Sequence, residues 1–523
     1  MLFNSFPFLL GFLPVTFALF YILGATNRRL AAIWLTAASL FFYGWWDPHY
    51  VLLLAASITV NFTFGLALAR AVASGAERAR GRLLFAAIAA NLVLLSYFKY
   101  SGFIAANISS LTGSAFVMQG VILPLGISFF TFTQIAFLVD TYRGYVREFN
   151  FVHYVLFVTY FPHLIAGPVL HHKEMMPQFA HASTYRLNAE NIAVGLTAFF
   201  IGLFKKVVLA DGVAAYATPV FNAAEAGVHL TLFEAWSGLL AYSFQIYFDF
   251  SGYSDMAVGL SRMFGVRLPI NFYSPYQAHN ITEFWRRWHM TLSRFLRDYL
   301  YVPLGGNRKG ALRRYVNLML TMLLGGLWHG ASWTFVIWGG LHGLYLVVNH
   351  GWHIWNKRRG HSPTTSTRWS NVLAIALTFF AVAVAWVFFR APTQTAAFNM
   401  LQSMFGLRGL SLPAGIASIA PWLANLNVRF DGMFNHGLAP WSSGMLWLGA
   451  LAVITWFTPN TQQILNRFTP TLDGHATHLD GVRWQWYLWK PYWTHAVFIT
   501  ALGVTAAAWM LVGSYSEFLY FQF

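Results

Sequence analysis

The sequence of 523 residues contains no cysteine. This absence excludes disulfide bonds, thiolate metal sites and a cysteine nucleophile. Charged residues make up only 10% of the chain, whereas hydrophobic residues make up 57%. Soluble globular proteins carry about 25% charged residues, so the composition excludes that class and indicates an integral membrane protein.

Acidic residues are scarce: 17 Asp and Glu stand against 33 Lys and Arg, for a net charge of +16. In a soluble protein this excess would suggest nucleic-acid binding. Here the basic residues gather in short loops between apolar runs, as the positive-inside rule predicts. We therefore expect the lipid bilayer as a partner and no nucleic acid.

Apolar runs reach the roughly 20 residues that a helix needs to cross a bilayer, and they lack the alternation of a β-barrel. The prediction is an all-α polytopic membrane protein, with residues 1–523 as a single domain and a catalytic core at about 121–350. The first 24 residues lack the features of a cleavable signal peptide and are expected to form the first helix. The candidate spans are 2–24, 31–46, 51–69, 83–99, 121–139, 150–168, 191–218, 232–260, 315–350, 371–390, 443–458 and 493–514.

Loop charges predict the early topology. Arginines occupy the loops at 25–30, 70–82 and 140–149, whereas the loop after the second span has no Lys or Arg. This alternation places the three basic loops in the cytoplasm and the N-terminus outside. Beyond residue 168 the helix count stays open, because 171–190 and 281–314 could be interfacial or re-entrant.

Residues 281–300 have the three- and four-residue apolar spacing of an amphipathic helix, with Asn280 or Thr282 as its cap. One face is aromatic and aliphatic: Phe284, Trp285, Trp288, Leu292, Phe295, Leu296 and Tyr299. The other face is polar: Arg286, His289, Ser293 and Arg297. We expect this helix to lie at the membrane interface or to pack under the bundle.

His329 lies in a run without charged side chains between Arg314 and Lys357. A desolvated histidine stays neutral, which is the form that a general base requires. Gly325, Gly326 and Gly330 would let a ligand or another backbone approach closely. A hydrogen bond between helices would explain the same histidine, and the residues alone leave both interpretations open.

Two further histidines are weaker candidates. His289 on a basic interfacial face is commonly just solvated. His342 follows His329 by thirteen residues, which places it on roughly the opposite side of a continuous helix, so we interpret it as structural.

Asp249 and Asp255 lie in an apolar segment together with Ser251, Tyr253 and Ser254. Buried carboxylates need partners, so a structural ion pair with Arg286, Arg287 or Arg297 is favoured over catalysis. No metal is expected, because the spacing of Asp and His matches no ligand signature. The sequence also lacks a Gly-rich phosphate loop, a dinucleotide fingerprint and a nucleophile elbow.

Ten stretches resemble the membrane-bound O-acyltransferase family, in particular its bacterial branch that O-acetylates exopolysaccharides such as alginate. They are FFYGWW (41–46), SYFKY (96–100), LPLGISFFTF (123–132), FPHLIAGPVL (161–170), YFDFSGYSDMAVGL (247–260), ITEFWRRWH (281–289), LRDYLYVPLGGNR (296–308), TMLLGGLWHGASWTFVIWGGLHG (321–343), FFRA (388–391) and FLYFQF (518–523). The matches cover the chain in order from one end to the other.

The resemblance implies a bundle of about eleven or more transmembrane helices, with re-entrant or interfacial helices, around a central tunnel. It implies that His329 is the catalytic histidine and that His289 is the second characteristic position. The donor thioester would enter from the cytoplasm, and the acceptor or a partner protein would engage from the periplasm.

The sequence thus predicts an acetyltransferase that uses an acetyl thioester such as acetyl-CoA, with no bound cofactor, to O-acetylate a secreted polysaccharide, directly or through a serine of a periplasmic partner protein. Trp328, Asn307 or backbone amides are candidate oxyanion donors, and Gln245, Tyr247 and Ser254 are candidate substrate contacts. Two alternatives remain: a related enzyme that acts on teichoic acid, lipid or protein, and a transporter of acyl donor or polymer. Against a transporter, the spans show no inverted repeat.

Overall fold

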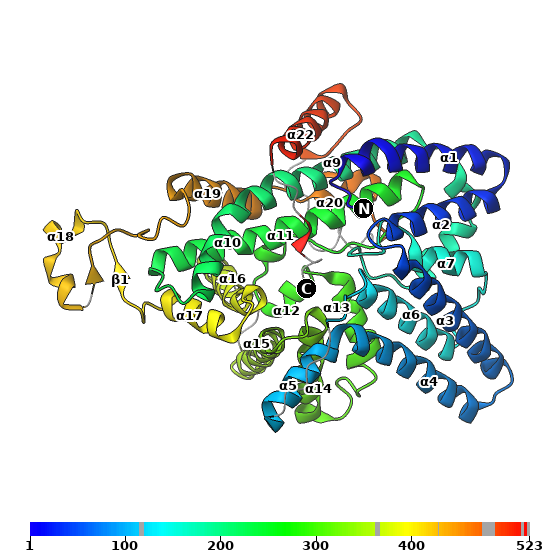
Figure 1. Ribbon diagram of the computed structural model, residues 1–523, viewed down its shortest axis with the longest axis horizontal. Helices are drawn as coiled ribbons and strands as arrows, with labels where there is room; N and C mark the ends of the chain where they lie inside the picture. Colours follow the sequence, from blue (N-terminus) through cyan, green and yellow to red (C-terminus); the bar gives the residue numbers. More distant parts are fainter. Residues whose placement is uncertain (114–119, 361–366, 427, 473–486, 514–516, 520–523) are drawn as a thin grey trace. The chain divides into compact units, whose positions relative to one another are not determined.

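In the computed structural model, residues 1–113, 120–360, 367–426, 428–472, 487–513 and 517–519 are described. This part of the chain is helical almost throughout, as the sequence predicts (Figure 1). The chain divides into two compact units. The first comprises Met1–Phe204, Ser251–Asn271 and Pro459–Gln522; the second comprises Lys205–Phe250, Phe272–Thr458 and Phe523. The single domain expected from the sequence stays a prediction.

The first unit begins with a run of helices that ends at Phe204. They are η1 (Pro7–Phe12), α1 (Leu13–Thr26), α2 (Arg28–Gly44), α3 (His49–Ala73), α4 (Glu77–Leu95), η2 (Ser96–Tyr100), α5 (Ser101–Thr112), α6 (Ile127–Tyr142), α7 (Phe151–Thr159), α8 (His172–Ala180), η3 (Ala182–Tyr185) and α9 (Ala189–Phe204). It also contains α20 (Thr461–Ile464), η9 (Asn466–Phe468) and α22 (Trp493–Val512). The helix α11 (Leu232–Met263) contributes residues to both units.

The second unit holds both histidines of the predicted site. Its other elements are η4 (Lys205–Ala210), α10 (Asp211–Glu225), η5 (Pro275–Gln277), α12 (Ile281–Trp285), α13 (Met290–Leu296), η6 (Arg297–Tyr301), α14 (Gly310–His329), α15 (Trp333–Arg358), α16 (Arg368–Arg390), α17 (Gln394–Met404), β1 (Leu410–Ser411), α18 (Ile416–Ile419), η8 (Pro421–Leu426), β2 (Val428–Arg429) and α19 (Trp441–Phe457). The two short strands pair in parallel, with Leu410 opposite Val428 and Ser411 opposite Arg429.

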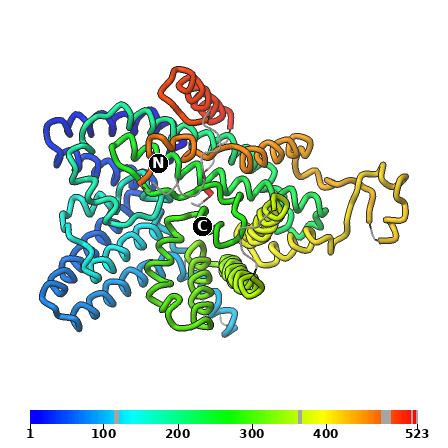
Figure 2. Tube along the Cα trace, turned by 180° about the vertical axis from the view of Figure 1, so that it is seen from behind, coloured from blue at the N-terminus to red at the C-terminus, as the bar shows by residue number. Residues whose placement is uncertain are grey.

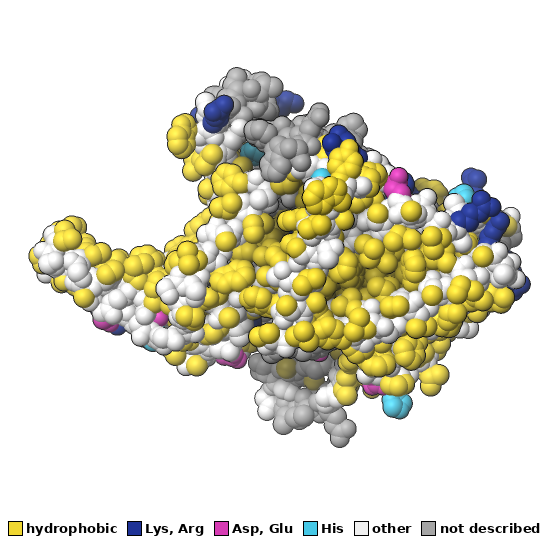
Figure 3. All heavy atoms as spheres, turned by 90° about the horizontal axis from the view of Figure 1, so that it is seen from above, with side chains coloured by type: hydrophobic (Ala, Val, Ile, Leu, Met, Phe, Trp, Pro, Cys, Tyr) yellow, Lys and Arg dark blue, Asp and Glu magenta, His cyan; other side chains and the backbone are white. Residues whose placement is uncertain are grey.

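Six helical segments of the described residues are long and apolar enough to cross a membrane. They are Pro7–Thr26, His49–Ala73, Glu77–Thr112, Ala189–Glu225, Arg368–Arg390 and Trp493–Val512. Large apolar side chains on them stay exposed, such as Phe85 at 76% and Val512 at 91%. On the face shown in Figure 3, hydrophobic side chains predominate and charged ones gather in small groups. Such a surface suits lipid rather than water.

Several expected spans differ from the helices. The span expected at 150–168 is helical only in α7, because the chain turns irregularly from Tyr160 onward. The span expected at 121–139 starts as a helix only at Ile127, after Gly126 in the left-handed region (φ 71°). Apolar composition alone does not locate such breaks, since buried irregular segments are as apolar as helices.

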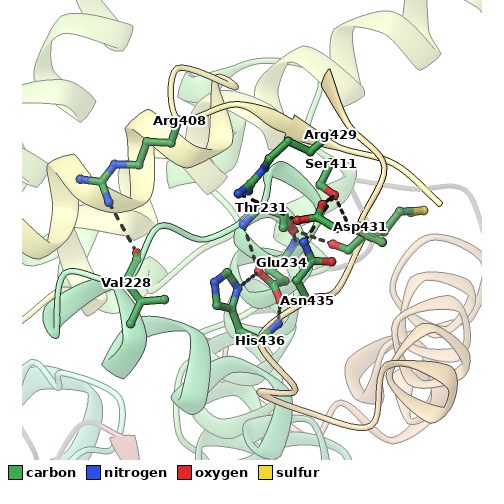
Figure 4. A network of polar contacts seen from close by, with 11 residues as sticks. Val228, Thr231, Glu234, Arg408, Ser411, Arg429, Asp431, Asn435 and His436 are labelled. Atoms are coloured by element: carbon green, nitrogen blue, oxygen red, sulfur yellow. Dashed lines mark hydrogen bonds and ion pairs between the residues drawn. The ribbon is translucent and has the colours of Figure 1, made fainter. Parts of the chain in front are cut away.

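Within the second unit, residues 405–440 form an arm that extends beyond α17 and α19 (Figure 2). A hydrogen-bonded network ties the base of this arm to the start of α11 (Figure 4). Glu234 is fully buried and accepts from the His436 amide (2.9 Å), the Thr231 amide (3.0 Å) and the His436 ring (2.7 Å). Thr231 also donates to the Met433 carbonyl (2.6 Å). The network therefore fixes where the arm leaves the helices.

The C-terminal FLYFQF stretch (518–523), the last of the ten that carry the resemblance, falls partly outside the described residues, because 520–523 are not described. Of the last stretch, Phe518 is buried and its ring packs edge-on against Tyr253 in the first unit, with ring centroids 4.6 Å apart.

Candidate active site

His329 is the last residue of α14, and α15 starts four residues later at Trp333. Gly330 takes an extended conformation (φ −160°), and the Ser332 side chain accepts from the Thr334 amide (3.3 Å), which caps α15. The single helix expected over 315–350 is therefore wrong: the segment is a helical hairpin. The break places His329 at a helix end, where its ring can face inward from the connection.

Glycines hold the two helices of this hairpin, which lie side by side, in close contact (Figure 1). A Cβ on Gly326 would lie 2.2 Å from the Phe335 carbonyl oxygen, and one on Gly339 would lie 2.3 Å from the Met322 carbonyl oxygen. A Cβ on Gly330 would lie 2.1 Å from the Phe335 ring. Of the glycines expected around His329, Gly326 thus lets another backbone approach, and Gly330 makes room for the Phe335 ring.

Aromatic rings enclose His329, which is 6% exposed. The rings of Trp328 and Trp338 each lie 5.0 Å from its ring, and the Phe389 ring lies 5.2 Å away, all in edge-to-face arrangements. Edge-to-face packing is the favoured geometry for aromatic pairs and fixes ring orientation. The shell contains no charged side chain, so it forms a low-dielectric setting for a proton acceptor.

His289 lies in a break between α12 and α13, so the single helix expected over 281–300 is wrong. Asn280 caps α12 as expected, by accepting from the Glu283 amide (3.0 Å). His289 itself adopts a left-handed conformation (φ 43°, ψ 52°) and caps α13. Residues other than glycine rarely adopt that region, and such strain is concentrated at functional sites. A periodic pattern alone gives no sign of one strained residue.

The His289 side chain is completely buried rather than exposed on a basic face. Its ring meets the Phe250 ring edge-on at 4.7 Å and stacks on the Phe272 ring at 6.4 Å. Burial lowers the pKa of His289 to about 3, so the imidazole is neutral near pH 7.

The structure brings the two predicted histidines together within the second unit. Their ring centroids are 6.5 Å apart, and the Trp328 ring lies 6.4 Å from His289 and 5.0 Å from His329. At this separation the two imidazoles are close enough to act on neighbouring atoms of one bound group. Two imidazoles in an apolar shell suit proton transfer between neutral reactants.

The buried carboxylate Asp249 forms an ion pair with Lys206 (2.8 Å), and Lys206 also contacts Asp211 (2.7 Å). The predicted partners were arginines of the 281–300 segment instead. Arg297 pairs with its neighbour Asp298 (2.7 Å), and Arg287 pairs with Glu283 (2.8 Å). Arg286 is exposed. Lys206 was missed because it lies in a π-helical turn inside an apolar run, about 40 residues from Asp249 in sequence.

Two residues of the predicted site belong to the first unit. Ser254 accepts from the Asn271 side chain (3.1 Å). Asp255 accepts from the Thr461 hydroxyl (2.6 Å) and the Gln462 amide (3.3 Å), so its expected structural role is filled by neutral donors. Neither contact involves the two histidines.

Three predicted substrate contacts lie in the second unit. The Tyr247 ring is 6.4 Å from Trp288, the neighbour of His289. Gln245 is buried, and no described residue hydrogen-bonds to its Oε1. Asn307 is exposed and precedes α14, whereas His329 ends that 20-residue helix. A helix of that length spans about 30 Å, so Asn307 cannot donate to a reaction at His329.

Trp338 and Phe389 are the shell residues that sequence reasoning missed. Trp338 is four residues before His342 on α15, and this i, i+4 pair of a tryptophan and a histidine is the signal that could have identified it. Among the described residues, no group of three or more His, Asp or Glu side chains is placed to hold a metal ion.

Comparison with known proteins agrees with these features. Residues 20–390 match the model of the membrane-bound O-acyltransferase family. A peptidoglycan O-acetyltransferase of Helicobacter pylori is 44% identical over 83% of this chain and 85% of its own length. A probable alginate O-acetylase of Pseudomonas aeruginosa is 43% identical over 77% and 75%, respectively. Another probable alginate O-acetylase, from Pseudomonas putida, is 38% identical over 100% of both chains.

These relatives share most of their length with this chain, and the family match includes α12 to α15 with both histidines. The chain therefore belongs to the membrane-bound O-acyltransferase family and is an acyltransferase of the membrane.

Proposed function

We propose that this protein transfers an acetyl group from a cytoplasmic thioester, acetyl-CoA, to a hydroxyl group and so serves the O-acetylation of a secreted polysaccharide. The observation that carries the proposal is the pair of rings of His289 and His329, 6.5 Å apart in an aromatic shell. The relatives named above, which act on alginate or peptidoglycan, support an acetyl group and a glycan.

His329 acts as the general base. It takes the proton of the accepting hydroxyl while that oxygen attacks the thioester carbonyl carbon. The carbon–sulfur bond then breaks, and the departing thiolate receives the proton from His329. His289 is neutral because of its burial, and it hydrogen-bonds to an oxygen of the reactants. General-base assistance supplies about 10²–10⁴-fold in rate, and positioning supplies much of the rest.

The acceptor is a polymer of the alginate or peptidoglycan kind, reached directly or through a serine of a periplasmic partner protein. Loop charges support an N-terminus in the periplasm of the bacterial inner membrane and a donor entrance at the opposite face. The resemblance supports a central tunnel as the route by which donor and acceptor meet.

A transporter of acyl donor or polymer is the alternative of a different class. It predicts flux of donor or polymer without covalent transfer, and it needs no strained buried histidine beside a second one. An enzyme that acts on teichoic acid, lipid or protein would keep the same chemistry and differ in the acceptor.

The test uses purified protein in lipid vesicles with acetyl-CoA carrying a labelled acetyl group. His329→Ala should lower acetyl transfer to alginate or peptidoglycan fragments by about 10²–10⁴-fold. The matched control is His49→Ala, because the side chain of His49 is 93% exposed. A folded His329→Ala protein with full transfer would contradict the proposed role, and flux without transfer by the wild type would favour the transporter.

A further inference from the structure

A second cluster of buried polar atoms lies beside His329. No described residue hydrogen-bonds to Nε1 of Trp285, to Nε1 of Trp338 or to either ring nitrogen of His342. His342 is fully buried and Trp338 is 1% exposed. Leaving a buried polar group without a partner costs roughly 1–3 kcal/mol, so four such atoms in one place call for an explanation.

The three rings lie in mutual contact. The His342 ring lies 4.8 Å from Trp338 and 5.1 Å from Trp285, and the two indole rings are 5.9 Å apart. Trp338 also contacts the His329 ring at 5.0 Å. One indole therefore belongs both to the shell of the general base and to the cluster of unpaired atoms.

A neighbouring tryptophan shows that an indole N–H in this region can find a hydrogen-bond partner within the protein. Trp386 packs on Trp338 with nearly parallel rings 5.9 Å apart, and its Nε1 donates to the Tyr276 hydroxyl (3.1 Å). The fold thus pairs the N–H of Trp386 within the protein and leaves those of Trp285 and Trp338 for something else.

We propose that the N–H groups of Trp338, Trp285 and His342 bind the carbonyl oxygen of the thioester donor. A neutral histidine offers one N–H and one bare nitrogen, so the cluster holds three donors and one acceptor. That inventory fits an oxygen that only accepts hydrogen bonds. None of the three side chains carries a positive charge, so the cluster suits a neutral carbonyl oxygen better than a phosphate or carboxylate.

This inference rests on the proposed function. As the accepting hydroxyl loses its proton to His329 and bonds to the carbonyl carbon, the carbonyl oxygen becomes an oxyanion. Fixed N–H donors in an apolar site stabilise that charge more than they stabilise the ground state. When the carbon–sulfur bond breaks, the carbonyl re-forms and the thiolate takes the proton from His329. The oxyanion donor is then an indole of α15, not Asn307.

The first experiment removes one donor and keeps the ring. Replacing Trp338 with its benzothienyl analogue, which has sulfur in place of N–H, or Trp338→Phe, should lower kcat about 10²–10³-fold with little change in KM for the donor. Trp386→Phe is the control, because its N–H is already used by Tyr276. Wild-type kcat with the benzothienyl residue at 338 would overturn the proposal, whatever the fate of Trp338→Phe.

The second experiment measures the binding of unreactive donor analogues, so that no turnover is needed. Wild-type protein should bind an oxopropyl thioether analogue of acetyl-CoA, which keeps the carbonyl, more tightly than the propyl thioether, which lacks it. The Trp338→Phe protein should show a smaller preference, because only two of the three proposed donors remain. A ratio unchanged by the substitution would mean that the indole N–H faces only neighbouring rings. Because His329→Ala tests the general base separately, an inactive His329→Ala protein with an unchanged ratio in Trp338→Phe refutes only the present inference.

Discussion

Two regions of the second unit bury polar atoms, and they differ in whether those atoms are hydrogen-bonded. In the network at the base of the arm, the Glu234 carboxylate accepts three hydrogen bonds and Thr231 both donates and accepts. In the cluster beside His329, four neutral polar atoms have no partner among the described residues. A network whose hydrogen bonds are all made adds rigidity. Unpaired donors in a closed site raise the free energy of the protein, and a ligand that accepts their hydrogen bonds removes that cost.

This difference distinguishes structural from functional polar groups in a membrane protein. Charge is not the criterion, since the carboxyl group of Glu234 belongs to the structural network, and the cluster that we propose to be functional is neutral. Completeness of hydrogen bonding is the criterion. It predicts that substitutions in the two regions will change different quantities, stability in one and rate in the other.

The largest effect should follow Gly326→Ala. The new methyl would lie 2.2 Å from the Phe335 carbonyl oxygen and would force α14 and α15 apart. We expect a loss of about 1–3 kcal/mol or more in stability and, because His329 is three residues away, about a 10²-fold loss of acetyl transfer. Thermal midpoint and transfer rate in detergent measure both effects.

The control for this substitution is Gly340→Ala on the same hairpin. Its methyl would lie 3.5 Å from the Leu323 side chain, an ordinary contact, so stability and rate should stay near those of wild type. Equal effects of the two substitutions would show that hairpin spacing does not set the geometry of the site.

His289→Gln should change the rate and leave the shape of the pH profile intact. Since the pKa of His289 is lowered to about 3, its imidazole is neutral from pH 5 to 9 and gives no inflection there. We expect a rate about 10²-fold lower with inflections at the same pH values. An inflection that vanishes in this variant would show that His289 titrates in that range. His279→Gln, at a partly exposed side chain of the same segment, is the control.

Glu234→Gln should have the smallest effect on turnover and a clear effect on stability. The amide nitrogen cannot accept one of the hydrogen bonds that the carboxylate accepts, so we expect a loss of about 1–3 kcal/mol with kcat unchanged. Arg429→Gln, at a side chain that is 50% exposed and 3.9 Å from Asp431, should change stability by less than about 0.5 kcal/mol. A drop in kcat for folded Glu234→Gln protein would abolish the proposed division between the regions.

Much of the architecture could be predicted from composition. Apolar runs located most of the helices, because a segment that crosses lipid must satisfy its backbone internally and be apolar along its length. The capping of α12 by Asn280 followed from local hydrogen-bonding preference. His329 could be named as a candidate because polar groups are costly in such surroundings, whereas His289 was named mainly through the family resemblance.

The breaks and the long-range partners could not be predicted. The left-handed conformation of His289 and the extended Gly330 depend on what packs around them, and no local pattern encodes either. The partner of Asp249 is Lys206, which comes from a different helix. His342 was assigned to the side opposite His329 because the thirteen-residue separation was counted along one continuous helix, whereas α14 ends at His329.

The glycine contacts between α14 and α15 require a fixed number of residues in the connection between the two helices. Gly326 faces Gly339, and Gly343 faces Met319, so the pairing of the two helices counts residues from the connection at 330–332. Inserting one residue in that connection would turn one partner by about 100° against the other. Trp338 would then no longer contact His329, even though every side chain would still be present. The active site is thus defined by a count of residues as much as by their identity.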